Sequence, residues 1–137
     1  MRRLTLLAAA ITLRGCLPPR AIWIETGSRV DHLVIGYSTT RGGTEPTYFS
    51  TLFVEECGTR PHTVGARFWL ISRRGPLVGY PTRITYGVAP EGFHSDSGPS
   101  ALRAGCFHVS TVEVQTTFDI QPDGRVVERP DQKLSVR

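Results

Sequence analysis

Cysteine and histidine are the residues of this chain with the widest chemical scope, because both can ligate a metal and both can act in catalysis. The 137-residue sequence holds three cysteines and four histidines, namely Cys16, Cys57, Cys106, His32, His62, His94 and His108. With reduced thiols, Cys57 near His62 and Cys106 near His108 would offer the sulfur and nitrogen ligands that copper and zinc prefer. A periplasmic copper- or zinc-binding protein is therefore one alternative function.

The spacing of these residues nevertheless argues against a metal site. No two histidines form a closely spaced ligand pair, and the pattern nearest to such a pair is His94 with Asp96. A blue-copper centre usually has an axial methionine, and Met1 is the only methionine here. We therefore predict that the chain holds no metal and no cofactor, and that its histidines are separate side chains on strand surfaces or in solvent.

Catalysis by a serine or by paired acids has as little support. A hydrolase needs a nucleophile with a base and an orienting group in reach, and no Gly-x-Ser-x-Gly sequence occurs. Glu55 and Glu56 are consecutive in a predicted strand, so their side chains should point to opposite faces rather than share a proton. We predict a non-enzymatic protein, with a hydrolase as a further alternative.

The N-terminal segment has the layout of a secretory signal. Two arginines follow the first residue, and the apolar run over residues 4–13 is too short to span a bilayer as a mature helix. The run ends in Leu13, Arg14, Gly15 and Cys16, which resembles the lipobox of bacterial lipoproteins: an aliphatic residue, then a small residue directly before the cysteine. Arg14 differs from the small or apolar residue that usually stands between them.

This resemblance implies a cellular location and a membrane anchor. It implies that residues 1–15 are a signal peptide, that cleavage precedes Cys16, and that a diacylglycerol group is attached to the Cys16 thiol. Two prolines follow Leu17 and cannot continue a helix, so residues 16–20 should form a short lipidated tether. Because Leu17 is not aspartate, the sorting tendency of the family favours the outer membrane. We expect a bacterial cell-envelope protein, lipid-anchored at the periplasmic face of the outer membrane or at the cell surface.

Export would also decide the state of the other two cysteines. With Cys16 assigned to the lipid, Cys57 and Cys106 remain as an even pair in an oxidising compartment. We predict a disulfide between them, which would close a loop of about 50 residues and contribute about 4 kcal/mol in the chain-entropy description. The alternative is two free buried thiols.

The body of the chain has the composition of an all-β protein. Glycine (14) and proline (10) are frequent, and no stretch suits a long helix. Residues 114–121 alternate between two faces, as a half-buried strand does, and a Pro-Asp-Gly turn follows them. We predict strands at residues 21–25, 32–38, 48–57, 64–71, 83–88, 105–112, 114–121 and 125–128, a loop at 90–100 and a flexible tail at 129–137. Residues 21–128 should therefore form an antiparallel β-sandwich of seven or eight strands.

Three residues suggest a closer relation. Cys57, Trp69 and Cys106 resemble the Cys, Trp, Cys skeleton of immunoglobulin domains, although Ala104 stands where those domains have a tyrosine before the second cysteine. The resemblance is to the looser group of immunoglobulin-like and fibronectin type III-like sandwiches in small bacterial lipoproteins, over residues 21–128. It implies a fold and no activity.

The charge balance argues against a nucleic-acid partner. The formal net charge is +4, but the residues before Cys16 hold three of the 16 basic side chains and none of the 12 acidic ones, which leaves +1 after processing. Nucleic-acid binding requires a basic patch that survives processing. Arginines of the body could instead form a strip for glycans or lipid headgroups, but we expect them to be dispersed over the strands. These are Arg60, Arg67, Arg73, Arg74, Arg83 and Arg103.

Together these features predict a membrane-anchored envelope lipoprotein that acts as a non-enzymatic binding or structural module. The membrane contact is the lipid on Cys16, and the expected partner is an envelope protein or a glycan. Most aromatic side chains should lie in the core, and an exposed pair near residues 90–100 would be a candidate for binding.

Overall fold

The computed structural model describes residues 19–58, 64–76 and 79–129. The predicted signal peptide, Cys16 and residues 130–137 of the predicted tail lie outside the described residues, as do Arg60 and His62. No helix that could cross a membrane is found in the described part of the chain.

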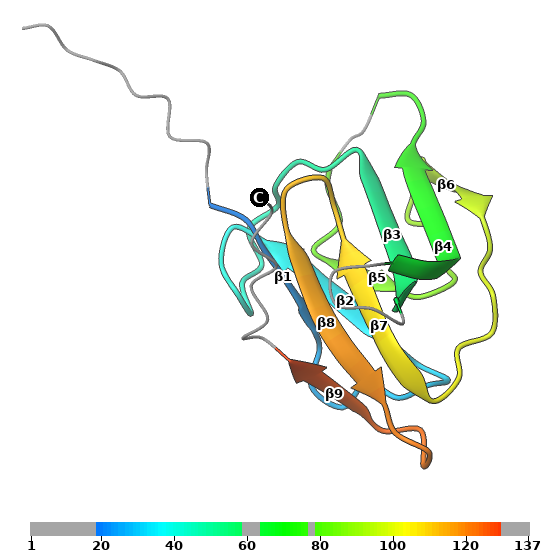
Figure 1. Cartoon of the computed structure of the whole chain (residues 1–137). Helices are drawn as coiled ribbons and strands as arrows, with labels where there is room; N and C mark the ends of the chain where they lie inside the picture. The colour runs from blue at the N-terminus through cyan, green and yellow to red at the C-terminus, as the bar shows by residue number, and fades with distance from the viewer. Residues whose placement is uncertain (1–18, 59–63, 77–78, 130–137) are drawn as a thin grey trace, which may run out of the picture.

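Nine strands in the described residues form two antiparallel sheets (Figure 1). The smaller sheet has the order β1-β2-β5, with bounds Ala21–Ile24, Val34–Ser38 and Arg83–Thr85. The larger sheet has the order β6-β4-β3-β7-β8-β9. Its strands are β3 (Thr51–Cys57), β4 (Val64–Arg73), β6 (Phe93–Ser97), β7 (Gly105–Ser110), β8 (Gln115–Ile120) and β9 (Val126–Arg129). The predicted all-β sandwich is confirmed.

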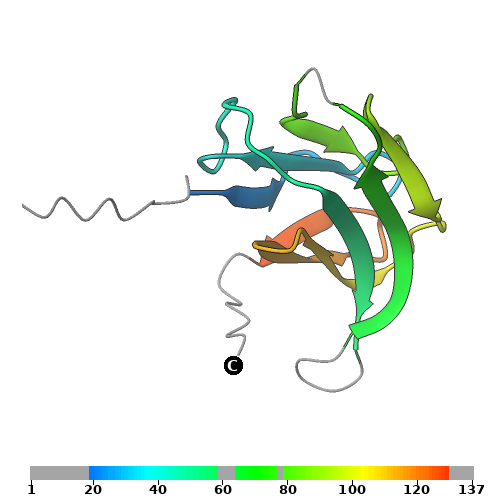
Figure 2. The same ribbon diagram turned by 90° about the horizontal axis from the view of Figure 1, so that it is seen from above.

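The core lies between the two sheets because alternate side chains of each strand point inward. The smaller sheet contributes buried residues that include Ile24, Ile35, Tyr37 and Ile84; the larger contributes Leu52, Val54, Trp69, Ile71, Phe107, Val109, Phe118 and Ile120. Strand β4 is strongly curved (Figure 2), and the β4–β6 ladder is irregular between Leu70 and Ile71. Such irregularities bend a strand and raise its twist, which lets the larger sheet close over the core.

One prediction about the strands is wrong. Residues 90–100 were expected to form a loop, but Phe93–Ser97 is strand β6, which pairs with β4 at the edge of the larger sheet. Only Phe93 of this strand is buried, and the side chains at positions 95–97 are exposed. An edge strand of this kind lacks the apolar alternation on which the expectation relied.

Strand β5 is shorter than predicted, ending at Thr85 instead of Val88. Gly87 has a φ of 83°, a left-handed conformation that a strand cannot contain. The chain turns there, with the Val88 amide donating to the Thr85 carbonyl at 3.0 Å.

The predicted disulfide between Cys57 and Cys106 is present, with the two Cα atoms 5.3 Å apart. Its position differs from the immunoglobulin pattern, in which the bond joins the two sheets. Here Cys57 ends β3 and Cys106 lies in β7, and these strands are neighbours in one sheet. Trp69, in β4, belongs to that same sheet. The three residues therefore do not form an inter-sheet skeleton.

Candidate functional site

A small pocket opens at one end of the sandwich. Its volume is about 240 Å³. Four segments line it: the residue before β1, strand β2, the chain leading into β3, and the β7–β8 turn. The lining residues are Arg20, Tyr37, Tyr48, Phe49, Ser50, Thr111, Val112 and Glu113. None of these was predicted as a site, because the segments are far apart in the sequence and only the fold joins them.

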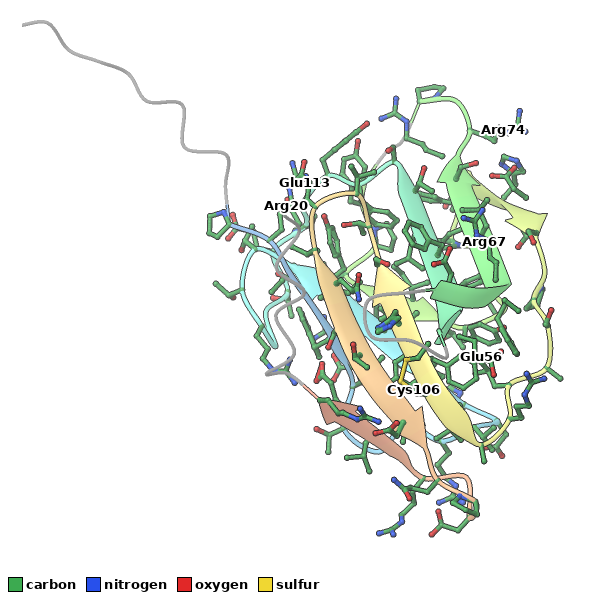
Figure 3. The ribbon with its side chains drawn as sticks, in the orientation of Figure 1. Arg20, Glu56, Arg67, Arg74, Cys106 and Glu113 are labelled. Carbon is green, nitrogen blue, oxygen red and sulfur yellow. A yellow bond between two sulfur atoms is a disulfide. The ribbon has the colours of Figure 1, made fainter. Side chains whose placement is uncertain are left out.

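Arg20 is the most unusual residue of this pocket. Its side chain is only 11% exposed and forms an ion pair with Glu113, which lies beside it at the same end of the sandwich (Figure 3). The guanidinium carbon lies 5.9 Å from the centre of the Tyr48 ring. The buried Nε has no hydrogen-bond partner among the described residues. A buried donor without a partner is costly, so the Nε–H can bind an acceptor that enters the pocket.

The floor of the pocket is aromatic. The Tyr37 hydroxyl donates to the Tyr48 carbonyl at 2.9 Å, and burial raises the pKa of Tyr37. The Tyr37 and Phe49 rings meet edge to face, with centroids 4.9 Å apart. The pocket therefore combines an apolar floor, a fixed hydroxyl and one arginine–glutamate pair.

Two large apolar side chains at the rim of the pocket are exposed to solvent. Val112, in the β7–β8 turn, is 82% exposed, and Tyr48 is 45% exposed. The Arg73 guanidinium carbon lies 5.8 Å from the centre of the Tyr48 ring, and its Nη1 donates to the Tyr80 hydroxyl at 3.1 Å. The described part of the chain has no exposed aromatic pair near residues 90–100; the exposed aromatic side chain at this rim is Tyr48, which packs on Tyr80.

A row of polar side chains crosses the outer face of the larger sheet. Arg67 donates to Glu55 at 3.0 and 3.1 Å, Glu55 pairs in register with His108, and His108 pairs with Thr117. The His108 Nδ1 lies 2.8 Å from the Thr117 Oγ1. Burial lowers the pKa of His108, and this effect outweighs the opposing influence of Glu55.

The predicted alternation of residues 114–121 is confirmed only for its inner face. Thr116, Phe118 and Ile120 are buried as expected, but Thr117 on the outer face is also buried. Its hydroxyl is satisfied by His108 rather than by water.

Serine, histidine and aspartate do meet at the β4–β6 edge. Ser72 hydrogen-bonds to Asp96, the His94 Nε2 contacts the Asp96 carboxylate, and Arg74 donates to the His94 Nδ1 at 2.9 Å. The hydrogen bond from Ser72 is the main cause that lowers the pKa of Asp96. In a hydrolase the imidazole lies between hydroxyl and carboxylate, whereas here the carboxylate lies between the other two. The cluster joins the edge strand to β4 and lacks the order of a hydrolytic triad.

Two of the residues proposed for the metal alternative are joined in a disulfide. Cys57 and Cys106 are bonded to one another, so neither supplies a thiolate ligand in this state. His62 lies outside the described residues, and the described part of the chain contains no group of three His, Cys, Asp or Glu side chains that could hold a metal ion.

Four of the arginines considered as a basic strip are instead paired with acids. Their partners are Glu55 for Arg67, Asp96 for Arg74, Glu25 for Arg83 and Glu56 for Arg103. Arg73 contacts Tyr48 and Tyr80, and Arg60 lies outside the described residues. Each of these four described arginines therefore has a carboxylate beside it.

Fold and site together define an all-β sandwich with one disulfide inside its larger sheet and a small amphipathic pocket at one end. Comparison of the chain with protein-family models, with curated proteins and with solved structures finds no match.

Proposed function

We propose that the chain is a membrane-anchored envelope lipoprotein, lipidated on Cys16, whose sandwich domain is a non-enzymatic binding or structural module. Its class would be that of small bacterial lipoproteins with an immunoglobulin-like or fibronectin type III-like sandwich, although its disulfide lies inside one sheet. We place it at the periplasmic face of the outer membrane or at the cell surface, with an envelope protein or a glycan as its partner.

The observation that carries this proposal is the Cys57–Cys106 bond. Disulfides of this kind persist in oxidising compartments and are rare in the cytosol. Export accounts for such a bond, and the sequence from Leu13 to Cys16 offers the route of export and the site of the anchor. The pocket at Arg20 supports binding of a small amphipathic group at this end of the domain, because its lining combines aromatic rings with a buried arginine and a glutamate.

The test is lipid attachment to the full chain produced in a two-membrane bacterium. Wild-type protein should incorporate labelled palmitate and move into the detergent-rich phase on phase separation, because two or three acyl chains hold a protein at a membrane persistently. The Cys16→Ser variant should do neither.

Arg14→Ala provides the matched control, since it changes the irregular position next to the lipidated residue and keeps Cys16. It should incorporate label at least as well as wild type. Equal label and equal partitioning of wild type and Cys16→Ser would contradict the proposal.

A further inference from the structure

We propose that the end of the sandwich around Val112, Tyr48 and Arg73 is a docking surface for the lipid bilayer. This docking surface rests on the proposed lipidation of Cys16. It deepens that proposal, because it says which face of the domain the membrane covers and which faces stay open to a partner.

The first step is the length of the tether. Arg20 is the fourth residue after Cys16, and an extended chain spans at most about 3.6 Å per residue. Arg20, the residue before β1, therefore lies within about 14 Å of a lipidated Cys16. A compact domain of this length is larger than that distance, so with Cys16 lipidated the end that carries Arg20 lies close to the headgroup layer.

The second step is what this end displays. Val112 and Tyr48 are rim residues of the pocket that Arg20 lines, and they are 82% and 45% exposed. An aliphatic side chain at the tip of a turn can enter the acyl boundary, while tyrosine is enriched at the headgroup level. The two exposed apolar groups thus lie at the end where a bilayer would meet them.

The third step is charge. Arg73 contacts the Tyr48 ring, and in the described part of the chain its hydrogen-bond partner is the neutral Tyr80 hydroxyl rather than a carboxylate. Its positive charge remains available to a lipid phosphate, which accepts hydrogen bonds from arginine well. Arg20, by contrast, is already paired with Glu113.

Weak contacts suffice here because the anchor makes docking intramolecular. A short tether gives the docking surface a high effective concentration at the membrane. One valine, one tyrosine and one arginine would not hold an untethered domain there, but they can select one orientation of a tethered domain.

The opposite end of the domain supplies a matched control. Val88 is 61% exposed and follows β5 at the end where Thr85 pairs with Val34. Strand β1 begins at the other end of the same sheet, where Ala21 pairs with Ser38. Val88 and the docking surface are therefore similar in exposure and opposite in position.

The experiment compares Val112→Trp with Val88→Trp in the full lipidated chain. Each variant is reconstituted into vesicles of phosphatidylcholine and phosphatidylglycerol with or without brominated acyl chains, and vesicle-bound protein is isolated by flotation. The native indoles, Trp23 and Trp69, are 3% and 0% exposed, so they give the same background in both variants. Tryptophan fluorescence is then recorded.

Docking predicts a blue shift and a greater loss of emission to the brominated lipid for Val112→Trp than for Val88→Trp. Equal quenching of the two variants in floated vesicles, or none, would overturn the docking surface and leave the anchor intact. The same result is expected if this end binds an envelope protein rather than lipid, because the vesicles contain no such protein. Failure to float, with an unmodified Cys16 by mass spectrometry, would overturn the proposed function and the docking surface with it.

Discussion

His108 is a titratable side chain that is partly buried on the outer face of the larger sheet. Its imidazole is partly buried between Glu55 and Thr117 on neighbouring strands, and the Thr117 hydroxyl satisfies its Nδ1. Burial disfavours the protonated ring and lowers the pKa of His108. The folded protein therefore prefers the neutral imidazole, and protonation works against folding.

This environment predicts an acid-sensitive stability. In the unfolded chain a histidine takes up a proton as pH falls through 6.5, its ordinary pKa, whereas folded His108 resists protonation until a lower pH. The unfolded state then binds more protons, so the free energy of unfolding should fall as pH drops below about 6.5 and level off below the folded pKa. His108→Gln, which keeps a polar partner for Thr117, should flatten this dependence in urea unfolding.

The control for that experiment is His32→Gln, because His32 is exposed. It should retain the wild-type acid dependence. The same pH dependence in His108→Gln as in wild type would show that other groups cause it.

The strands show what local sequence can and cannot predict. The buried inner face of residues 114–121 and the turn at Gly124, with its φ of 85°, could be predicted because neighbouring residues determine both. Strand β6 was not readable, since an exposed edge strand has no apolar alternation. The pocket was hidden for another reason: Arg20 and Glu113 meet only after β1 and the β7–β8 turn are packed at one end. Nothing in the sequence around Arg20 predicts its ion pair with Glu113.

Gly36 illustrates a residue whose role is defined by its neighbours across the smaller sheet. It pairs with Trp23 in β1 and with Arg83 in β5. The Trp23 ring lies over Gly36 so closely that an added Cβ would come within 2.1 Å of it, and the Arg83 guanidinium carbon lies 5.0 Å from the ring centre. The glycine thus leaves the space in which the outward-facing indole is buried.

We therefore predict that Gly36→Ala destabilises the protein by about 1–3 kcal/mol, the usual cost of overpacking a filled site. The added methyl group would push Trp23 away from its place, so its emission should also shift to the red. Chemical denaturation followed by fluorescence measures both effects.

Gly79→Ala is the matched control, because an added Cβ there meets no atom within 4 Å. Its stability should equal that of wild type. An equally stable Gly36→Ala with unchanged emission would mean that the indole is not held by the space over Gly36.

For the whole domain, the sequence predicted the fold class but not the order of the strands in each sheet. The count of strands and turns indicated a sandwich, but the strand order depends on contacts such as that of β3 with β7, which are far apart in the chain. The resemblance of Cys57, Trp69 and Cys106 to the immunoglobulin skeleton also left the position of the bond unspecified, and in immunoglobulin domains the bond joins the two sheets. Pairing within the larger sheet places that bond between neighbouring strands instead.

This placement assigns the disulfide a definite role in stability. The two cysteines are 49 residues apart, and the loop that they close contains β4, β5 and β6, including a strand of the smaller sheet. In the chain-entropy description a loop of this length restricts the unfolded chain by about 4 kcal/mol. Small sandwich domains are marginally stable, so the bond would account for a large share of the total.

The double variant Cys57→Ala/Cys106→Ala should therefore unfold at much lower denaturant concentration than wild type, by about 4 kcal/mol, and reduced wild-type protein should behave in the same way. Cys16→Ser, which leaves the bond in place, should unfold like wild type under oxidising conditions. Thiol titration of denatured, unreduced protein fixes the redox state: Cys16→Ser should contain no free thiol. Equal stability of the double variant and wild type would refute the role of the bond in stability. Two free thiols in Cys16→Ser would show that the bond is absent and would remove the main observation in favour of export.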